Sequence, residues 1–511
     1  MKEFDLNSPL LTFVSQTEAA FWTVYNSFEG CQIFGGIGSG KTNFSGRKIS
    51  DAMINAGFGG LVLTCKPDEK QMWVDACKRA KRSKHLVILE PYENNRFNFL
   101  QYESTKSETN HAFTANIVDV LQTIINASSA KDGGRSNDEF WQNASDMLLH
   151  NLVSLLQMAY GTVTVQMMYD VAQSLPKEEE DLIDYDDTTS FEEEELSAYQ
   201  KAHKIVYDRV VPAVQEWENN LPIHLFDELK YSGKYDEELY EAIPDAREFK
   251  FVDAFFSDTL KKLNSKTRSI IDFSLIGFLF RLLQQPIYSL LCNGESNVTP
   301  ELCMAGKIVL INLPTKIYGK IGRDSQILIK FMFQRQFEKR TITPKSVPIF
   351  IWADEAHTFL HEKDADFQAT ARSSQVATVY LSQNINNYYS VMGGGKSEYR
   401  VKGFLGTMAT KLFHANSCLE TNKYASEIIG EDFFEDRTES STFSGKFSQS
   451  EGKSYKLRKI MRPEAFQVLK TGGKKCGYLS EAVIHRQGYP AFFGKNYFKA
   501  TFVLEESGTK K

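Results

Sequence analysis

Cysteine is scarce in this sequence, and its pattern suits neither a metal site nor a disulfide framework. Seven cysteines are scattered over 511 residues, at positions 31, 65, 77, 292, 303, 418 and 476. The number is odd and no two of them form a CxxC pair, which argues against a disulfide scaffold and a zinc knuckle. We therefore expect a reducing compartment, and hence a cytoplasmic protein.

Long hydrophobic runs and a net positive charge are also lacking. No uninterrupted apolar run approaches the roughly 18 residues that a membrane-spanning helix needs, and the N-terminal segment is too polar for a signal peptide. We expect no membrane anchor in this chain, with any membrane contact made peripherally through a larger complex. The net charge of −6 excludes a protein whose whole surface coats nucleic acid. DNA binding would need a local basic patch or a lined channel.

Short apolar runs alternate with helical patterns near both ends of the chain. Runs rich in Val, Ile and Leu, typical of buried parallel strands, occur at 31–34, 60–66, 85–91, 306–314, 347–355, 376–384 and 410–416. This alternation predicts an α/β fold with a parallel, doubly wound sheet.

The middle of the chain is long, helical in pattern and poor in strand signals. We predict that residues 1–102 and 296–511 form two parts of one α/β domain, with an all-helical domain inserted over 103–295. Within the insert, an acidic block at 177–196 predicts a solvated loop. The alternative for this block is a docking site for a basic partner. A Ser/Gly-rich stretch at 441–454 predicts a mobile loop.

A glycine-rich turn between a predicted strand and a predicted helix carries the clearest chemical signal. Gly35-x-x-x-x-Gly40-Lys41-Thr42 is a complete Walker A motif, whose backbone N–H groups and helix N-terminus bind the phosphates of ATP. We expect Lys41 to contact the β- and γ-phosphates and the Thr42 hydroxyl to ligate Mg²⁺. The predicted nucleotide-binding residues are Gly35, Gly36, Ile37, Gly38, Ser39, Gly40, Lys41, Thr42 and Asn43.

An acidic pair at the end of an apolar strand predicts the second half of the site. Asp354 would hold Mg²⁺, directly or through water, and Glu355 would polarise the attacking water. Together with Ala356 and His357 the pair spells the motif of DEAH-box helicases. However, 313 residues (354 − 41) separate Lys41 from Asp354, far more than such helicases place there, and no further helicase motif follows. We interpret His357 as a local packing residue.

One polar residue, Gln383, lies near the end of the strand predicted over 376–384, and another, Arg372, precedes this strand. Gln383 would place an amide beside the γ-phosphate or its attacking water. Arg372 precedes the strand and is either an ordinary surface residue or an arginine finger that completes a neighbouring subunit's site. Basic loops at 370–375 and 393–402 are candidate DNA contacts, although a solvated glycine turn is the favoured interpretation of the second.

Taken together, these motifs resemble the conjugative coupling ATPases of type IV secretion, the TraG/TraD group of the FtsK–HerA superfamily. The pattern Phe-Trp-x-x-Ala-x-x-x-Leu-Leu at 140–149 is the most telling match outside the catalytic motifs. Further matches lie at 61–70, 85–100, 306–326 and 455–469. Two departures are that the strand usually ending in Asp-x-Lys-Gly reads Thr-Cys-Lys-Pro-Asp at 64–68, and that only 34 residues precede Gly35, where the family commonly has membrane helices.

The resemblance implies a P-loop NTPase (RecA-like) motor domain with an inserted all-helical domain. It also implies a ring of subunits, a hexamer, around single- or double-stranded DNA, in which each site is completed by a neighbour's arginine. This favours Arg372 as the finger. The catalytic residues would then be Lys41, Glu355, Arg372 and Gln383.

The leading prediction is an ATP-hydrolysing, ring-forming DNA translocase of the coupling-protein type. The alternative is an ATP-dependent factor that couples or recruits a protein substrate in a secretion, phage or defence system, with its partner bound at the helical insert. A nucleotide-binding scaffold without catalysis is disfavoured, because the Lys41, Thr42, Asp354 and Glu355 set is intact. Stimulation of ATP hydrolysis by DNA would favour the translocase. Stimulation by a protein partner alone would favour the protein-coupling factor.

Overall fold

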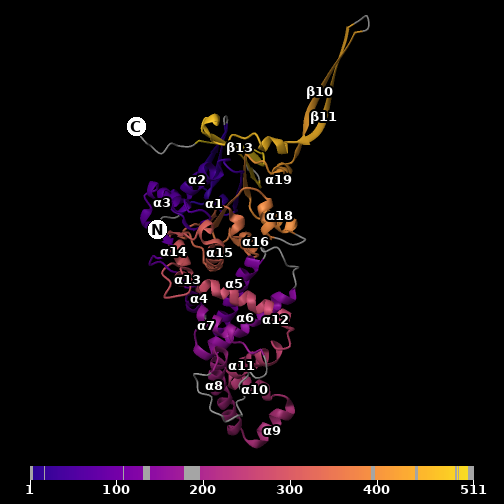
Figure 1. The fold of residues 1–511 in the computed structure, drawn as a ribbon. Helices are drawn as coiled ribbons and strands as arrows, with labels where there is room; N and C mark the ends of the chain where they lie inside the picture. Colours follow the sequence, from indigo (N-terminus) through magenta and orange to yellow (C-terminus); the bar gives the residue numbers. More distant parts are fainter. Residues whose placement is uncertain are drawn as a thin grey trace. The chain divides into compact units, whose positions relative to one another are not determined.

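The computed structural model describes residues 4–15, 18–107, 109–129, 139–177, 196–392, 397–443, 447–488, 492 and 494–503. They belong to two compact units (Figure 1). We call Met1–Ile88, Pro300–Gly319 and Phe333–Lys511 the sheet unit, and Leu89–Thr299 with Lys320–Met332 the helical unit. The division into domains at 102/103 and 295/296 stays a prediction.

A nine-stranded sheet forms the core of the sheet unit, with the strand order β13-β12-β9-β3-β8-β7-β4-β6-β5. The strands are β3 (Cys31–Phe34), β4 (Gly59–Leu63), β5 (Leu86–Leu89), β6 (Ile308–Ile311), β7 (Ile349–Ala353), β8 (Val376–Ser382), β9 (Thr410–His414), β12 (Leu479–Arg486) and β13 (Tyr497–Val503). The first seven fall within the seven predicted runs or shift from them by one residue. The predicted α/β class is therefore confirmed.

Pairing in the sheet is parallel from β9 through β3, β8, β7 and β4 to β6. Every residue of β3, β4, β6, β7, β8 and β9 is buried. Burial on both faces explains why these strands read as continuous apolar runs rather than as alternating ones. The sheet differs from the expected all-parallel one at one edge, where β12 pairs antiparallel with β9 and β13.

Helices of the sheet unit pack on this sheet. They are α1 (Val24–Ser27), α2 (Arg47–Ala56), α3 (Glu69–Arg79), α14 (Pro300–Met304), α16 (Asp364–Thr370), α17 (Asn386–Met392), α18 (Ser397–Gly406) and α19 (Leu419–Ile429). On α3, Trp73 stacks on Phe350 of β7 with ring centroids 5.6 Å apart and meets Trp352 edge-on at 5.5 Å. Such aromatic contacts add to the area that the rings bury.

Short elements complete the sheet unit. A π-helical turn, η1 (Lys41–Gly46), precedes α2, and 3₁₀ turns occur at η2 (Ser83–His85), η5 (Ala356–Thr358), η6 (Pro463–Phe466) and η7 (Lys474–Cys476). Two hairpins stand outside the large sheet: β1 (Pro9–Val14) with β2 (Ala19–Thr23), and β10 (Glu431–Phe443) with β11 (Phe447–Lys459). The latter corrects the mobile loop expected at 441–454. None of its described side chains, at 431–438 and 452–459, is buried, and a strand without a buried face lacks the alternation by which strands are predicted.

The helical unit is built from helices over most of its described length. They are α4 (Phe99–Lys106), α5 (Asn110–Ser129), α6 (Glu139–Tyr160), α7 (Val165–Gln173), α8 (Ala198–Asn220), α9 (Ile223–Ser232), α10 (Tyr235–Ala242), α11 (Pro244–Ala254), η4 (Phe255–Thr259), α12 (Ser265–Leu283) and α13 (Ile287–Leu291). The last long helix, α15 (Thr315–Lys339), contributes to both units.

The helix α6, which contains the Phe-Trp-x-x-Ala-x-x-x-Leu-Leu pattern at 140–149, is partly described. Leu148, Leu152 and Leu155 of α6 are fully or almost fully buried, as expected for packing between helices. The side chains of Phe140 and Trp141, and residues 178–195 of the acidic block, lie outside the described residues. No helix in the described part of the chain is both long enough and apolar enough to cross a membrane.

Candidate functional site

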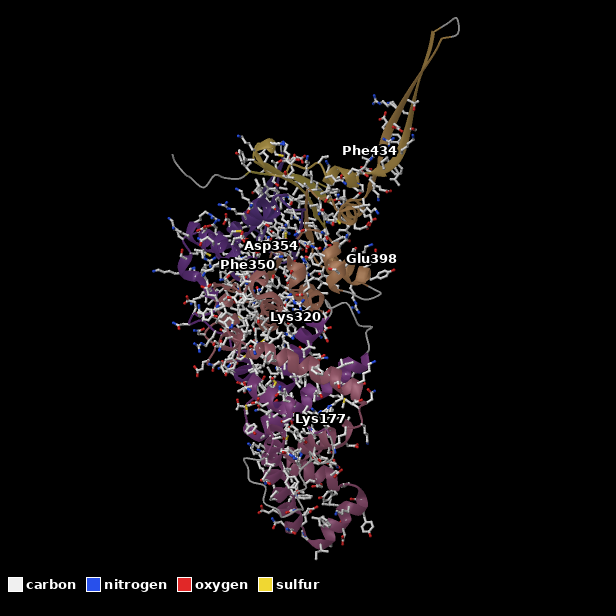
Figure 2. The ribbon with its side chains drawn as sticks, in the orientation of Figure 1. Lys177, Lys320, Phe350, Asp354, Glu398 and Phe434 are labelled. Carbon is white, nitrogen blue, oxygen red and sulfur yellow. The ribbon has the colours of Figure 1, made fainter. Side chains whose placement is uncertain are left out.

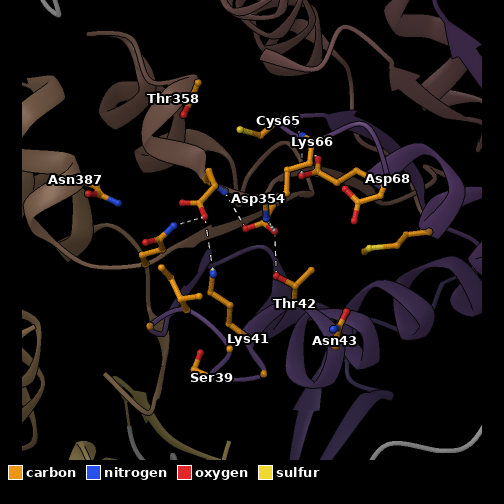
Figure 3. A pocket seen from close by; sticks show the side chains of 18 of the residues that line it. Ser39, Lys41, Thr42, Asn43, Cys65, Lys66, Asp68, Asp354, Thr358 and Asn387 are labelled. Carbon is orange, nitrogen blue, oxygen red and sulfur yellow. Dashed lines mark hydrogen bonds and ion pairs between the residues drawn. The ribbon is translucent and has the colours of Figure 1, made fainter. Parts of the chain in front are cut away.

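A cavity of about 680 Å³ lies in the sheet unit where β3, β7 and β8 end. Ligands of open α/β sheets bind at this edge, outside the carboxyl ends of the strands. Eight of the nine predicted nucleotide-binding residues line the cavity, together with Asp354, Glu355 and Gln383 (Figure 3). The exception is Gly35, which leads from β3 into the turn. The remaining lining residues are Cys65, Lys66, Asp68, Glu69, Met72, Lys316, His357, Thr358 and Asn387.

The turn after β3 needs its glycines for conformation and for space. Gly38 and Gly40 have φ values of 70° and 93°, which residues with a side chain rarely adopt. A Cβ atom on Gly40 would lie 2.6 Å from Ser480 Oγ, and one on Gly35 would lie 2.4 Å from Ser39 Oγ. The turn is thus held close to its neighbours while its inner side faces the cavity, as a phosphate-binding loop requires.

The residues predicted to bind Mg²⁺ come together. Thr42 Oγ1 donates a hydrogen bond to Asp354 Oδ2 over 3.0 Å (Figure 3). Asp354 is almost fully buried, and its other oxygen, Oδ1, accepts the Glu355 N–H over 2.9 Å. A hydroxyl and a carboxylate at this separation are hard oxygen donors that fit a small divalent cation.

Glu355 lies at the centre of the predicted catalytic group. Lys41 Nζ is 3.9 Å from its Oε1, and Gln383 Nε2 donates to the same oxygen over 2.9 Å. The other oxygen, Oε2, is buried and accepts no hydrogen bond from the described residues, so it can accept one from a water molecule. Glu355 also has a φ of 50°, an unusual value for a residue with a side chain, of the kind found at functional sites.

Arg372 is the one predicted catalytic residue that the structure does not bring to this cavity. It is exposed and belongs to the turn before β8, whereas Gln383 follows the last residue of that strand. Seven strand residues at ~3.3 Å each separate the two by about 23 Å. Within one subunit, Arg372 therefore lies at the N-terminal end of β8, and the cavity lies at its C-terminal end.

Several lining residues were missed or read differently from the sequence. Lys66 Nζ lies 3.5 Å from Asp354 Oδ2. The Glu69 carboxylate accepts the backbone N–H groups of Cys65 and Lys66, and burial, together with the charge of Asp354, raises its pKa to about 8. Lys66 and Glu69 follow β4, so their place just after a predicted strand was the signal that could have assigned them to the site. His357, expected to pack locally, has its Nδ1 3.8 Å from Glu355 Oε2 and lines the cavity.

Behind the turn, a chain of hydrogen bonds joins the P-loop backbone to two strands. Ser45 Oγ lies 3.1 Å from the Lys41 carbonyl oxygen and 2.7 Å from His414 Nε2 at the end of β9, and its single proton is donated to one of the two. His414 Nδ1 lies 3.3 Å from Ser480 Oγ on β12, which donates to the Ser39 carbonyl over 3.2 Å. Burial lowers the pKa of His414 to about 3, so its ring is neutral near pH 7. Sequence reasoning missed this chain.

Two family models match the chain. Residues 11–217 match "Type IV secretory system Conjugative DNA transfer", and residues 348–471 match "TraM recognition site of TraD and TraG". The first description names conjugative DNA transfer by a type IV secretory system, and the second names TraD and TraG, the group that the sequence motifs resemble. No curated protein sequence matches the chain.

Solved structures of the plasmid coupling protein TrwB share the fold. The complex with the GTP analogue GDPNP has a TM-score of 0.58 at 12% identity and covers 100% of this chain and 99% of its own. The complex with ADP and Mg²⁺ has a TM-score of 0.55 at 11% identity and covers 99% and 97%. An unbound form lacking 70 N-terminal residues has a TM-score of 0.54 at 11% identity and covers 98% and 90%. These likenesses confirm the predicted P-loop NTPase fold.

Proposed function

The chain belongs to the conjugative coupling proteins of type IV secretion, and from this premise we propose that it is an ATP-hydrolysing motor that moves DNA. The observation that carries the proposal is the convergence of Lys41, Thr42, Asp354, Glu355 and Gln383 on one cavity. That TrwB structures hold nucleotide analogues, and in one case ADP with Mg²⁺, supports the same cofactors here.

Each residue of this group has a proposed part in hydrolysis. The P-loop N–H groups bind the phosphates, and Lys41 moves from Glu355 to the β- and γ-phosphate oxygens. Mg²⁺, held by Thr42 and Asp354, would neutralise charge on these oxygens. Glu355 orients the attacking water and accepts its proton, while Gln383 holds the Glu355 carboxylate in place. Water bonds to the γ-phosphorus, the bond to the β-phosphate oxygen breaks, and ADP leaves.

The test is steady-state ATP hydrolysis by the purified protein with and without single- and double-stranded DNA, at low and moderate salt. We expect strong stimulation by DNA that weakens as salt rises, because phosphate contacts release counterions. Lys41→Ala should abolish binding or turnover, and Glu355→Gln should bind ATP but hydrolyse it slowly. Wild-type turnover in Lys41→Ala would refute the site.

A second candidate function is the coupling of a protein substrate, and the match to a TraM recognition model over 348–471 favours it. On this alternative, a protein partner stimulates hydrolysis and DNA does not. The match would place that partner's surface within residues 348–471 of the sheet unit, and the helical insert expected from the sequence is the other candidate. Turnover indifferent to both DNA forms at low salt would favour this function over the motor.

We also propose that subunits form a hexameric ring in which Arg372 completes a neighbour's site. Arg372 is exposed and precedes β8, whereas the cavity of the same subunit follows β8. This position suits a role in the site of a second subunit. Arg372→Ala should bind nucleotide but lose turnover, and mixing it with Lys41→Ala should restore part of the activity. The matched control is Lys345→Ala, which removes another exposed cation, located shortly before β7 as Arg372 is located before β8. No recovery on mixing would refute the role in trans.

A further inference from the structure

The β10–β11 hairpin is a sheet of its own with two unpaired edges. Thirteen residues on each strand pair in register, from Glu431 opposite Lys459 to Phe443 opposite Phe447. In the described part of the chain, no third strand joins either side (Figure 1). Each outer edge therefore presents a row of backbone N–H and C=O groups that can pair with another strand.

The two strands carry opposite charge. The described side chains of β10, over 431–438, include four carboxylates and one arginine, a net charge of −3. Those of β11, over 452–459, include four cations and no carboxylate, a net charge of +4. Four ion pairs cross the hairpin: Glu431 with Lys459 over 3.1 Å, Asp436 with both Lys456 and Arg458 over 2.8 Å, and Glu435 with Lys453 over 3.4 Å. The hairpin thus has one acidic edge and one basic edge.

One face of the hairpin also exposes large apolar side chains. Phe433 lies opposite Leu457, and Tyr455 is two residues along on the same face. Their exposed fractions are 66%, 56% and 69%. Phe434, on the other face, is 40% exposed (Figure 2). An isolated two-stranded ribbon is marginally stable in water, so a partner that adds strands and covers these rings would stabilise it.

We propose that the hairpin is a docking arm for a second copy of this chain, with the acidic edge of one hairpin pairing with the basic edge of the next. A partner of another kind would need to match one edge only. Here both halves of a complementary pair occur in the same chain, which favours self-association. Each carboxylate of β10 would then lie between two basic strands, its own β11 and that of the neighbour.

The geometry of this pairing fits a closed assembly. When hairpins related by rotation point the same way, β10 of one copy runs antiparallel to β11 of the next. Because the two edges differ, the contact is head-to-tail, and such contacts close into rings when the rotation allows it. The closure into a ring rests on the proposed function, which includes a ring of subunits. The pairing of the hairpin edges rests on the hairpin alone.

The test uses a charge-swapped hairpin that keeps its internal ion pairs. Reversing both partners of the pairs made by Glu431 and Asp436, while Glu435 and Lys453 stay unchanged, moves β10 from −3 to +1 (−3 + 4) and β11 from +4 to −2 (4 − 6). The substitutions are Glu431→Lys, Asp436→Lys, Lys456→Glu, Arg458→Glu and Lys459→Glu. A half-swapped variant carries only the two changes on β10. Oligomer size and mixing are measured by mass photometry and by energy transfer between dyes on separate protein preparations.

We expect the wild-type and fully swapped proteins each to self-associate, but not to mix with each other, because their facing edges carry like charges. The half-swapped variant should associate at least about tenfold more weakly than the wild type, since both facing edges would then carry positive charge. Free mixing of swapped and wild-type subunits, or undiminished association of the half-swapped variant, would overturn the proposal. A wild-type protein that stays monomeric at all concentrations would also overturn it.

Nucleotide binding separates this result from a failure of the proposed function. None of the described hairpin residues lines the cavity, so every variant should bind a fluorescent ATP analogue as the wild type does. Loss of nucleotide binding by the wild type would count against the ATPase alone. Self-association unchanged in every variant, with only DNA or partner-protein binding altered, would show that the hairpin serves that other ligand and would refute docking of a second copy.

Discussion

His414 offers the sharpest test of how the P-loop is held. Its neutral ring lies between the hydroxyls of Ser45 and Ser480. These hydroxyls are within hydrogen-bond distance of the Lys41 and Ser39 carbonyl oxygens. We consider His414→Gln, whose amide can still donate and accept but does not titrate, beside His414→Ala, which removes the bridge. The glutamine variant isolates the effect of the histidine's charge, and the alanine variant tests its contacts.

The expected size of the pH effect follows from the pKa of about 3 in the folded protein, against 6.5 for an unperturbed histidine. The folded pKa is depressed, so between these values the unfolded chain binds more protons and stability falls as pH falls. Going from pH 7.5 to 5.5, the lost stability is about 1.4 kcal/mol from this residue. His414→Gln should lack that loss. His414→Ala, which also leaves a cavity and breaks two hydrogen bonds, should cost about 3–5 kcal/mol at pH 7.5.

The assay is urea unfolding of wild type and both variants at pH 7.5 and 5.5, with nucleotide affinity measured at pH 7.5. His485, whose pKa burial lowers to about 4, titrates in the same window in all three proteins and cancels in the comparison. Weaker nucleotide binding is expected for His414→Ala and much less for His414→Gln. An equal loss of stability on acidification in wild type and His414→Gln would show that the ring is not held neutral and would refute the reasoning.

Three other changes test further parts of the sheet unit. Gln383→Ala should lower the turnover number about tenfold or more while leaving nucleotide affinity within about twofold, because one charge-assisted hydrogen bond to Glu355 is lost; an unchanged turnover number would contradict this. Lys411, whose pKa burial lowers to about 8, should contribute about 2 kcal/mol of stability as pH rises from 7.5 to 9.5, so the change in wild type should exceed that in Lys411→Met by this amount, while Glu69 titrates in both and cancels. Gly40→Ala should abolish nucleotide binding in a titration, since its Cβ would lie 2.6 Å from Ser480 Oγ and its φ is 93°; binding as in wild type would contradict the loop geometry.

The local motifs of the site could be read from the sequence because each depends on one contiguous segment. The Walker A turn lies between a strand and a helix, and the acidic pair Asp354-Glu355 ends a buried strand. Parallel strands end at a common edge, so placing these segments together needed only the fold class. The two family models confirm the family resemblance, and the TrwB structures confirm the predicted fold.

The rest of the site depends on which strands are neighbours, and a single sequence does not reveal that. His414 and Ser480 support the P-loop only because β9 lies beside β3 and β12 beside β9. Lys66 reaches Asp354 only because β4 pairs with β7. The β10–β11 hairpin escaped prediction for another reason, because strands exposed on both faces lack the period-2 pattern by which a half-buried strand is recognised.

The strand order of the large sheet has a consequence for synthesis. β3, which carries the P-loop, pairs with β8 and β9, whose residues emerge more than 300 positions later. From Phe34 to His414 is 380 residues (414 − 34), which a ribosome needs roughly 20–75 s to add at ~5–20 residues per second. Until residue 382 is added the apolar N-terminal segment lacks both of its strand partners, and until residue 414 it still lacks β9. Nascent chains stalled before residue 410 should therefore be cut by protease near β3 and engage chaperones, whereas chains released after residue 503 should be resistant there.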